Sequence, residues 1–182
     1  MSQFDIAIVG AGMVGASLAC GLIDAGFKVA LIESGELNPS QNWPLGQVDA
    51  RVSALSLASE NLLKTLNVWP VLANMARFQA YSAMHVWDAC GTGRLHFTAA
   101  EQHVPYLGHI VENCTITSAL HQTLAHKQYQ LFEHSEIVDL TSQEISPRRL
   151  SFASGEQISA SIVVGADGAN SKIRQLAGLP TR

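Results

Sequence analysis

Hydrophobic positions near the start of the chain follow a strand, helix, strand order. The run from Phe4 to Val9 is rich in isoleucine and valine, and Gly10-Ala11-Gly12 interrupts it. That composition is typical of a strand buried on both faces. Apolar and small residues continue from Met13 to Ala25, Gly26 occupies a usual stop position for a helix, and residues 28–32 predict a second buried strand. Such a unit implies two parallel strands joined by a right-handed crossover.

Beyond this unit, short apolar runs alternate with turn-forming residues. Residues 35–46 contain two prolines and predict an exposed loop. An extended segment is expected over Arg51 to Leu57, followed by an amphipathic helix over 59–66 that Ser59 caps. The remaining pattern predicts a hairpin with strands at 84–87 and 95–97, helices at 116–125 and 170–177, strands at 129–132, 136–140, 149–152 and 158–164, and turns at Ser146-Pro147 and Ser154-Gly155. The fold class is therefore α/β, a Rossmann-like βαβ domain with a parallel sheet and an antiparallel β segment.

Composition excludes several classes of protein. The 182 residues include 11 Lys and Arg against 15 Asp and Glu, and this net charge of −4 argues against a nucleic-acid binder. A hydrophobic content of 47% excludes a disordered chain. Cys20, Cys90 and Cys114 are widely spaced and odd in number, which favours a cytoplasmic protein without disulfides. The scattered histidines imply no metal site. Residues 6–23 are uncharged, but four glycines break the run, so no membrane-spanning helix is expected.

Residues 10–15 form the pattern G-x-G-x-x-G directly after the first predicted strand and before the first predicted helix. Gly10 permits the tight turn, Gly12 lets the main chain approach a pyrophosphate, and Gly15 allows close packing of helix on strand. Unpaired amides at the helix start, with the positive end of the helix dipole, would bind the phosphates. The sequence thus predicts a dinucleotide site formed by Gly10, Ala11, Gly12, Met13, Val14 and Gly15.

Glu33 follows the second predicted strand at nearly the spacing expected of an acid that binds an adenosine ribose. Its carboxylate would repel a 2′-phosphate, so FAD or NAD is expected at this site and NADP is disfavoured. The glycine motif and Glu33 leave the choice between FAD and NAD open.

A second motif over residues 162–174 distinguishes the two cofactors. Its sequence, I-V-V-G-A-D-G-A-N-S-K-I-R, resembles the G-A-D-G-x-x-S-x-V-R element of class A flavoprotein aromatic hydroxylases, the para-hydroxybenzoate hydroxylase-like family. At such a turn Asp167 can accept bonds from main-chain amides and ribose hydroxyls, Gly168 supplies a positive φ, and Ser171 can cap the following helix. The resemblance implies FAD as the cofactor, with Asp167 and Gly168 in its site.

Two further segments resemble the same family. Residues 49–55, D-A-R-V-S-A-L, are similar to its D-x-R-x-x-A-L element, whose arginine reaches the flavin side of the cofactor. This resemblance places Arg51, Val52 and Ser53 in the FAD site. Residues 107–113, L-G-H-I-V-E-N, resemble the segment that opens the helix beside the cofactor, with Asn113 facing the flavin. Asn113 could equally cap that helix.

Together these segments resemble most closely the branch that hydroxylates ubiquinone precursors. The resemblance implies a monooxygenase in which NAD(P)H reduces FAD and O2 supplies the hydroxyl group to a polyprenylated phenol or benzoquinol. A polyprenyl substrate implies peripheral contact with the inner membrane. The residues identify no catalytic side chain, because His85, His96 and His109 are each better explained by surface or structural roles.

Members of the family are about twice as long as this chain and carry a later Gly-Asp motif that is absent here. We therefore expect an N-terminal portion: residues 1–182 form the FAD-binding domain, and the hairpin at 82–106 belongs to an incomplete substrate domain. Weak flavin affinity, no hydroxylation and self-association through exposed edges are expected. The alternatives are an NAD-linked Rossmann dehydrogenase, which would continue with more parallel βαβ units after Glu33, and a non-catalytic nucleotide-binding module.

Overall fold

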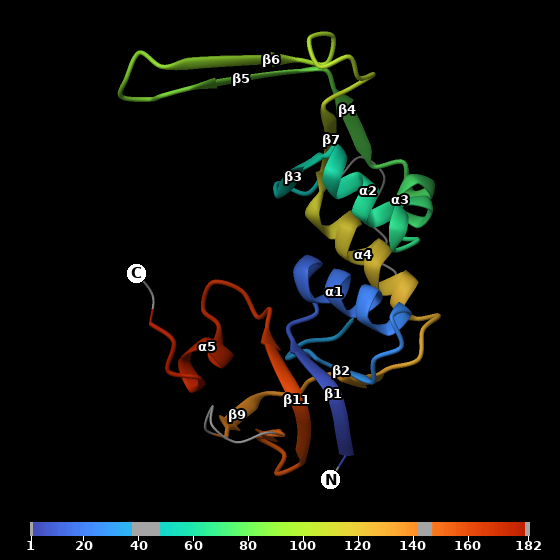
Figure 1. The fold of residues 1–182 in the computed structure, drawn as a ribbon, viewed down its shortest axis with the longest axis vertical. Coiled ribbons are helices and arrows are strands. Elements are labelled where there is room, and N and C mark those ends of the chain that lie inside the picture. The colour runs from blue at the N-terminus through green and yellow to red at the C-terminus, as the bar shows by residue number, and fades with distance from the viewer. Residues whose placement is uncertain (1, 38–47, 142–146, 181–182) are drawn as a thin grey trace. The chain divides into compact units, whose positions relative to one another are not determined.

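The computed structural model describes residues 2–37, 48–141 and 147–180. Most of the loop expected at 35–46 lies outside the described residues, as does Ser146 of the expected Ser146-Pro147 turn. The chain divides into two compact units, one formed by Met1–Ser40 with Leu120–Arg182 and the other by Gln41–Ala119 (Figure 1). Each unit has its own sheets.

The first unit contains a six-stranded sheet. Its elements are β1 (Ser2–Val9), α1 (Met13–Asp24), β2 (Val29–Ile32), β8 (Gln130–Phe132), β9 (Ile137–Leu140), β10 (Arg148–Phe152), β11 (Gln157–Gly165) and α5 (Lys172–Leu176). The strand order is β8-β2-β1-β11-β10-β9. Strands β8, β2, β1 and β11 pair in parallel, whereas β10 pairs antiparallel with both β11 and β9. The predicted combination of a parallel sheet with an antiparallel segment is confirmed.

The register of this sheet brings three chain segments to one edge. Val9 pairs with Ile32 on one side and with Gly165 on the other, so β1, β2 and β11 end at the same level. The residues that follow these strands therefore lie close together. This edge is the place where ligands bind in open parallel sheets.

Burial explains why these strands form the centre of the unit. All four residues of β2 are buried, and residues 6–9 of β1 are buried as well. The buried residues of helix α1 are all small, so its backbone can approach the sheet; they are Gly15, Ala16, Ala19 and Cys20. A core of aliphatic and aromatic residues from β1, β2, β9, β10 and β11 stabilises the arrangement.

The second unit contains antiparallel strands and short helices. Its elements are β3 (Val52–Ser56), α2 (Leu57–Thr65), α3 (Trp69–Met75), β4 (Phe78–Tyr81), β5 (Ala83–Trp87), β6 (Arg94–Thr98) and β7 (Gly108–Glu112), and α4 (Asn113–Leu124) begins in it. Strand β7 lies between β3 and β4, and β5 and β6 form a separate hairpin. The hairpin is thus confirmed, and the extended segment predicted over Arg51 to Leu57 is strand β3, although Leu57 already belongs to α2.

Other predictions for the second unit need correction. Ser56, not Ser59, is the N-cap of α2, because Ser56 has an extended backbone and its hydroxyl accepts the Ser59 amide at 3.3 Å. Helix α3 and strand β4 were not predicted. Helix α3 ends at Ala76 in the left-handed conformation, φ 53°, where the sequence offers no glycine as a stop signal. Helix α4 starts at Asn113, three residues before the predicted start.

None of the helices in the described part of the chain combines the length and the apolarity that a membrane crossing requires.

Candidate functional site

The three glycines of the G-x-G-x-x-G motif have different surroundings, so a side chain would have a different effect at each. Gly10 has φ +98°, and a Cβ there would lie 2.4 Å from the Ala166 carbonyl oxygen. A Cβ on Gly15 would lie 1.9 Å from the Gly10 carbonyl oxygen, so only glycine lets α1 pack this closely. A Cβ on Gly12 would meet nothing within 4 Å. The turn and the packing thus explain Gly10 and Gly15, whereas at Gly12 the backbone faces open space that a ligand can occupy.

The start of α1 offers backbone donors that the helix itself does not satisfy. Gly12 is the N-cap residue, with an extended backbone and no side-chain capping bond. The first four amides of any α-helix, counted from the N-cap residue, lack an intrahelical acceptor, and here these belong to Gly12, Met13, Val14 and Gly15. With the positive end of the helix dipole they favour an anion at this position.

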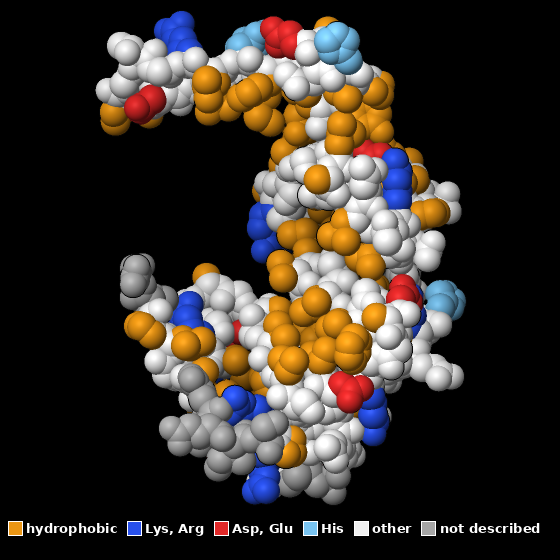
Figure 2. Space-filling view, in the orientation of Figure 1, with side chains coloured by type: hydrophobic (Ala, Val, Ile, Leu, Met, Phe, Trp, Pro, Cys, Tyr) orange, Lys and Arg blue, Asp and Glu red, His pale blue; other side chains and the backbone are white. Residues whose placement is uncertain are grey.

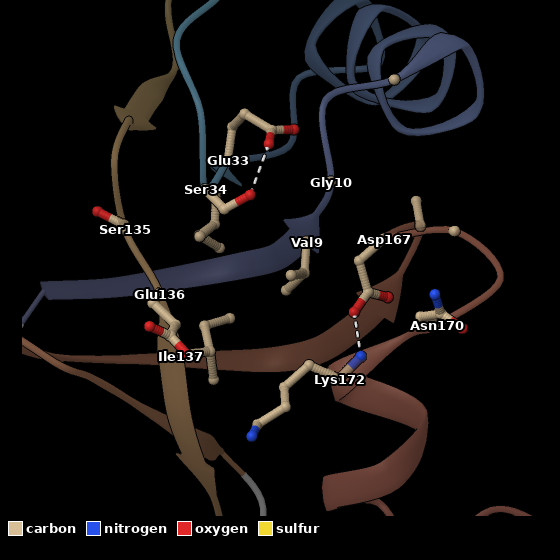
Figure 3. Close-up of a pocket in the computed structure, with 14 residues that line it drawn as sticks. Val9, Gly10, Glu33, Ser34, Ser135, Glu136, Ile137, Asp167, Asn170 and Lys172 are labelled. Carbon is tan, nitrogen blue, oxygen red and sulfur yellow. Dashed lines mark hydrogen bonds between the residues drawn. The ribbon is translucent and has the colours of Figure 1, made fainter.

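Glu33 points from the end of β2 toward the glycine loop (Figure 3). Its Oε2 accepts the Ala11 amide at 2.7 Å, while Oε1 accepts the Ser34 hydroxyl and the Gly35 amide, each at 3.1 Å. Burial raises the pKa of this carboxyl, but the hydrogen bonds from Ala11, Gly35 and Ser34 outweigh burial and hold the pKa below its ordinary value. Glu33 is therefore an anion beside the loop at neutral pH.

A cavity of about 470 Å³ lies at this edge of the sheet (Figure 3). Its volume is within the usual range for small-molecule sites. The lining comes from the ends of β1, β2 and β11 and from the segment between β8 and β9, and includes Gly10, Gly12, Glu33, Ser135, Glu136, Asp167, Gly168 and Lys172. Sequence analysis did not identify Ser135 and Glu136, because no local motif marks them and only the parallel pairing of β8 with β2 brings them to the site.

Asp167 is bound to the helix that follows it. Its Oδ1 accepts the Ser171 hydroxyl at 2.5 Å, and Oδ2 accepts the amides of Lys172 and Ile173 at 2.6 and 3.2 Å. Burial raises the pKa of Asp167, but these hydrogen bonds outweigh burial and lower it. Gly168 has the predicted positive φ, +84°, and Ser171 is the N-cap of α5. Asp167 thus fixes the loop whose Ala166 carbonyl faces Gly10.

The site residues predicted in the second unit lie together at the junction of β3, β7 and α4. The Ser53 hydroxyl donates to the Asn113 side-chain oxygen at 2.6 Å. The backbone amide of Asn113 donates to the backbone carbonyl of Arg51 at 2.9 Å. Val52 pairs with Glu112 in the adjoining strands. Asn113 is the first residue of α4, with its side chain directed to Ser53. The Arg51 side chain is exposed.

Glu112, which sequence analysis did not single out, connects this junction. Its Oε2 accepts Arg77 at 2.7 Å and the Asp49 amide at 2.9 Å, although Glu112 is only 8% exposed. The hydrogen bond from Arg77, supported by the Asp49 amide, lowers the pKa of this carboxyl against the effect of burial. The only local signal was an acid just before a predicted helix, which does not reveal burial.

We expect Glu112→Gln to reduce the stability of the chain in a pH-dependent manner. A carboxyl with a lowered folded-state pKa stabilises the fold fully above its ordinary value of 4.5, and this stabilisation is lost as the pH falls through the folded-state pKa. At pH near 7 the variant should lose about 2 kcal/mol of unfolding free energy, and below pH of about 4 the difference should shrink. Urea unfolding at both pH values measures it. A constant difference would contradict the assigned role of the carboxylate.

The histidines considered as general bases occupy structural positions. His109 is buried, its Nδ1 lies 3.1 Å from Glu60 Oε2, and the rings of Trp69, Phe78 and Tyr106 pack around it. His85 and His96 face each other across the hairpin with ring centroids 4.0 Å apart. These contacts agree with leaving the catalytic residues unassigned.

Curated proteins similar to this chain include ubiquinone hydroxylases. The 3-demethoxyubiquinol 3-hydroxylase of Escherichia coli is 42% identical over 176 residues, covering 96% of this chain and 44% of that protein. The mitochondrial ubiquinone biosynthesis monooxygenase COQ6 of Danio rerio is 36% identical over 193 residues, covering 98% of this chain and 39% of that protein. The chain thus spans less than half the length of these relatives.

Solved structures support the fold. The probable FAD-dependent monooxygenase pqsL from Pseudomonas aeruginosa matches with a TM-score of 0.72 and 17% identity over 100% of this chain and 47% of that one. At this identity the likeness concerns the fold alone. The sequence profile of the FAD-binding domain family matches residues 3–182. This match covers nearly the entire sequence, and the chain therefore belongs to the FAD-binding domain family.

Proposed function

We propose that this chain binds FAD as part of a flavin-dependent monooxygenase that hydroxylates an aromatic ring. The observation that carries the proposal is the glycine loop, which is open at Gly12 and has the Glu33 carboxylate directed to it. The dehydrogenase alternative expected further parallel βαβ units after Glu33. Instead, the chain after β2 enters the antiparallel strands of the second unit.

The residues of the cavity fit the ADP half of FAD. The amides of Gly12, Met13 and Val14 would hold the diphosphate at the start of α1. Glu33 would accept hydrogen bonds from the adenosine ribose, and Ala11, Gly10 and Gly15 keep the loop in position. Asp167 and Gly168 would complete the wall of the site.

We propose that Arg51, Val52, Ser53 and Asn113, the connected junction described above, contact the flavin half of the cofactor. This part of the proposal is supported by the resemblance of residues 49–55 and 107–113 to the family. When bound, FAD would supply the redox chemistry, taking electrons from NAD(P)H and passing them to O2. The role of these residues is to bind and orient the cofactor.

For the whole protein we propose a polyprenylated phenol or benzoquinol as the substrate. This part of the proposal is supported by relatives whose names specify ubiquinone biosynthesis and 3-demethoxyubiquinol hydroxylation. A substrate with a polyprenyl chain partitions into lipid, so we also propose a cytoplasmic location with peripheral contact at the inner membrane.

Nucleotide binding provides the test of the cofactor site. We expect ADP to bind at least about tenfold more tightly than its 2′-phosphorylated form, because Glu33 repels the extra phosphate. Glu33→Gln should weaken ADP binding roughly tenfold. It should also narrow the difference in affinity between ADP and its 2′-phosphorylated form. Isothermal titration calorimetry with both nucleotides measures the four affinities. Equal affinity of the unaltered chain for the two ligands would overturn the assignment of Glu33.

We propose that residues 82–106, which include the hairpin of β5 and β6, contribute to a substrate domain. Val86 pairs with Leu95 and Met84 with Phe97, so these side chains share one face. Val86, Leu95 and Phe97 are 45%, 60% and 42% exposed. Figure 2 shows hydrophobic side chains gathered along one side of this hairpin. Such a face normally packs against another layer.

We therefore expect the 182-residue chain to self-associate through this apolar face of the hairpin. Its average mass in light scattering should rise with concentration, and the double variant Val86→Ser/Leu95→Ser should reduce the rise. Leu62→Ser, on α2 and also exposed, is the matched control and should change nothing. A monomeric mass at all concentrations, or an equal effect of the control, would refute this expectation.

A further inference from the structure

Ala11 in the glycine loop is held from both sides. Its amide donates to Glu33 Oε2 at 2.7 Å, and its carbonyl oxygen lies 2.8 Å from Nε2 of His121. His121 comes from the C-terminal part of α4, 110 residues later in the chain. Nothing in the glycine motif or in Glu33 requires this second contact.

The chemistry of the contact defines the state of the ring. A carbonyl oxygen only accepts hydrogen bonds, so His121 Nε2 carries the proton and donates it. The residue is 7% exposed, and its Nδ1 is buried without a hydrogen-bond partner among the described residues. The neighbours Leu120 and Leu124 are fully buried on the same helix. Among the described residues, the bond to Ala11 is thus the hydrogen bond that this ring makes.

Peptide geometry transmits the contact to Gly12. The Ala11 carbonyl and the Gly12 amide belong to one planar trans peptide, so they point in opposite directions. When His121 holds the carbonyl, it directs the Gly12 N–H to the opposite side. Gly12 lines the cavity at the start of α1.

We propose that His121 is a positioning residue for the diphosphate site: by holding the Ala11 carbonyl, it orients the Gly12 amide for the phosphate. The inference rests on the proposed function, because it concerns the same cofactor site. Orienting a donor before the ligand arrives removes part of the ordering cost of binding. Loss of this orientation should weaken ADP binding roughly tenfold.

Two variants separate the hydrogen bond from simple packing. His121→Gln retains an N–H donor near the position of Nε2, whereas His121→Met removes the donor, and both residues are good helix formers. Calorimetric titration with ADP should show the unaltered chain and His121→Gln within about threefold of each other and His121→Met roughly tenfold weaker. With ADP bound, hydrogen exchange at the Gly12 amide should be faster in His121→Met alone.

The other outcomes of these titrations distinguish a failure of the proposed function from a failure of the role proposed for His121. Failure of the unaltered chain to bind ADP overturns the proposed function together with this inference. Normal ADP affinity of His121→Met, or equal losses in both variants, overturns the inference only. If His121→Met does not fold, the imidazole 15N spectrum of the unaltered chain decides, because a proton on Nδ1 in place of Nε2 would exclude the bond to Ala11.

Discussion

Gly12→Val is expected to abolish FAD binding while leaving the fold intact. Gly12 has φ −66° and ψ −175°, an extended conformation that valine adopts readily. A Cβ at this position meets no atom within 4 Å, so the side chain costs the unliganded protein little. It would instead fill the space through which the main chain approaches the diphosphate.

The measurement pairs affinity with stability. FAD or ADP affinity should fall by about a hundredfold or more, whereas the urea midpoint should stay nearly unchanged. Gly12→Ala is a graded control with a smaller side chain and should give a smaller loss of affinity. Normal affinity in Gly12→Val would show that the open space at Gly12 is not the diphosphate site.

Gly15→Ala, only three residues away, is expected to lower the stability of the chain, whereas Gly12→Val should leave it nearly unchanged. Its Cβ would lie 1.9 Å from the Gly10 carbonyl oxygen and 3.2 Å from the Ala166 Cβ. Because the first obstacle is backbone, α1 would have to move away from β1. We expect the free energy of unfolding to fall by about 3 kcal/mol or more, beyond the usual range for a surface substitution.

Urea unfolding of Gly15→Ala beside Gly12→Ala measures this difference within one motif. Gly12→Ala should lie within about 1 kcal/mol of the unaltered chain. If both variants unfold at the same urea concentration, the close approach of α1 to the Gly10 turn does not limit stability, and the separate roles assigned to the glycines would be wrong.

The parts that could be predicted from sequence are those with local signals. The βαβ unit, the turn at Gly10 and the N-cap at Ser171 each depend on neighbouring residues, and the structure confirms all three. Glu33 could also be singled out from the local sequence, because it directly follows a buried strand, and in the structure its carboxylate accepts the Ala11 amide of the loop.

Long-range contacts could not be predicted in this way. His121 and Glu136 reach the site only through the packing of α4 and the pairing of β8, which no local pattern encodes. Helix α3 and strand β4 could not be predicted for a different reason. The chain changes direction at Asn67 and Ala76, both with positive φ, and neither position is a glycine that would mark the stop.

The proposed cofactor site depends most on backbone amides at the start of α1 that bind a diphosphate. A titration of 15N-labelled chain with ADP, followed by amide NMR, tests this directly, with adenosine as the control that lacks phosphate. We predict that ADP shifts the Gly12, Met13 and Val14 amides strongly and that adenosine leaves them nearly unchanged. ADP-induced shifts that spare these three amides would contradict the account.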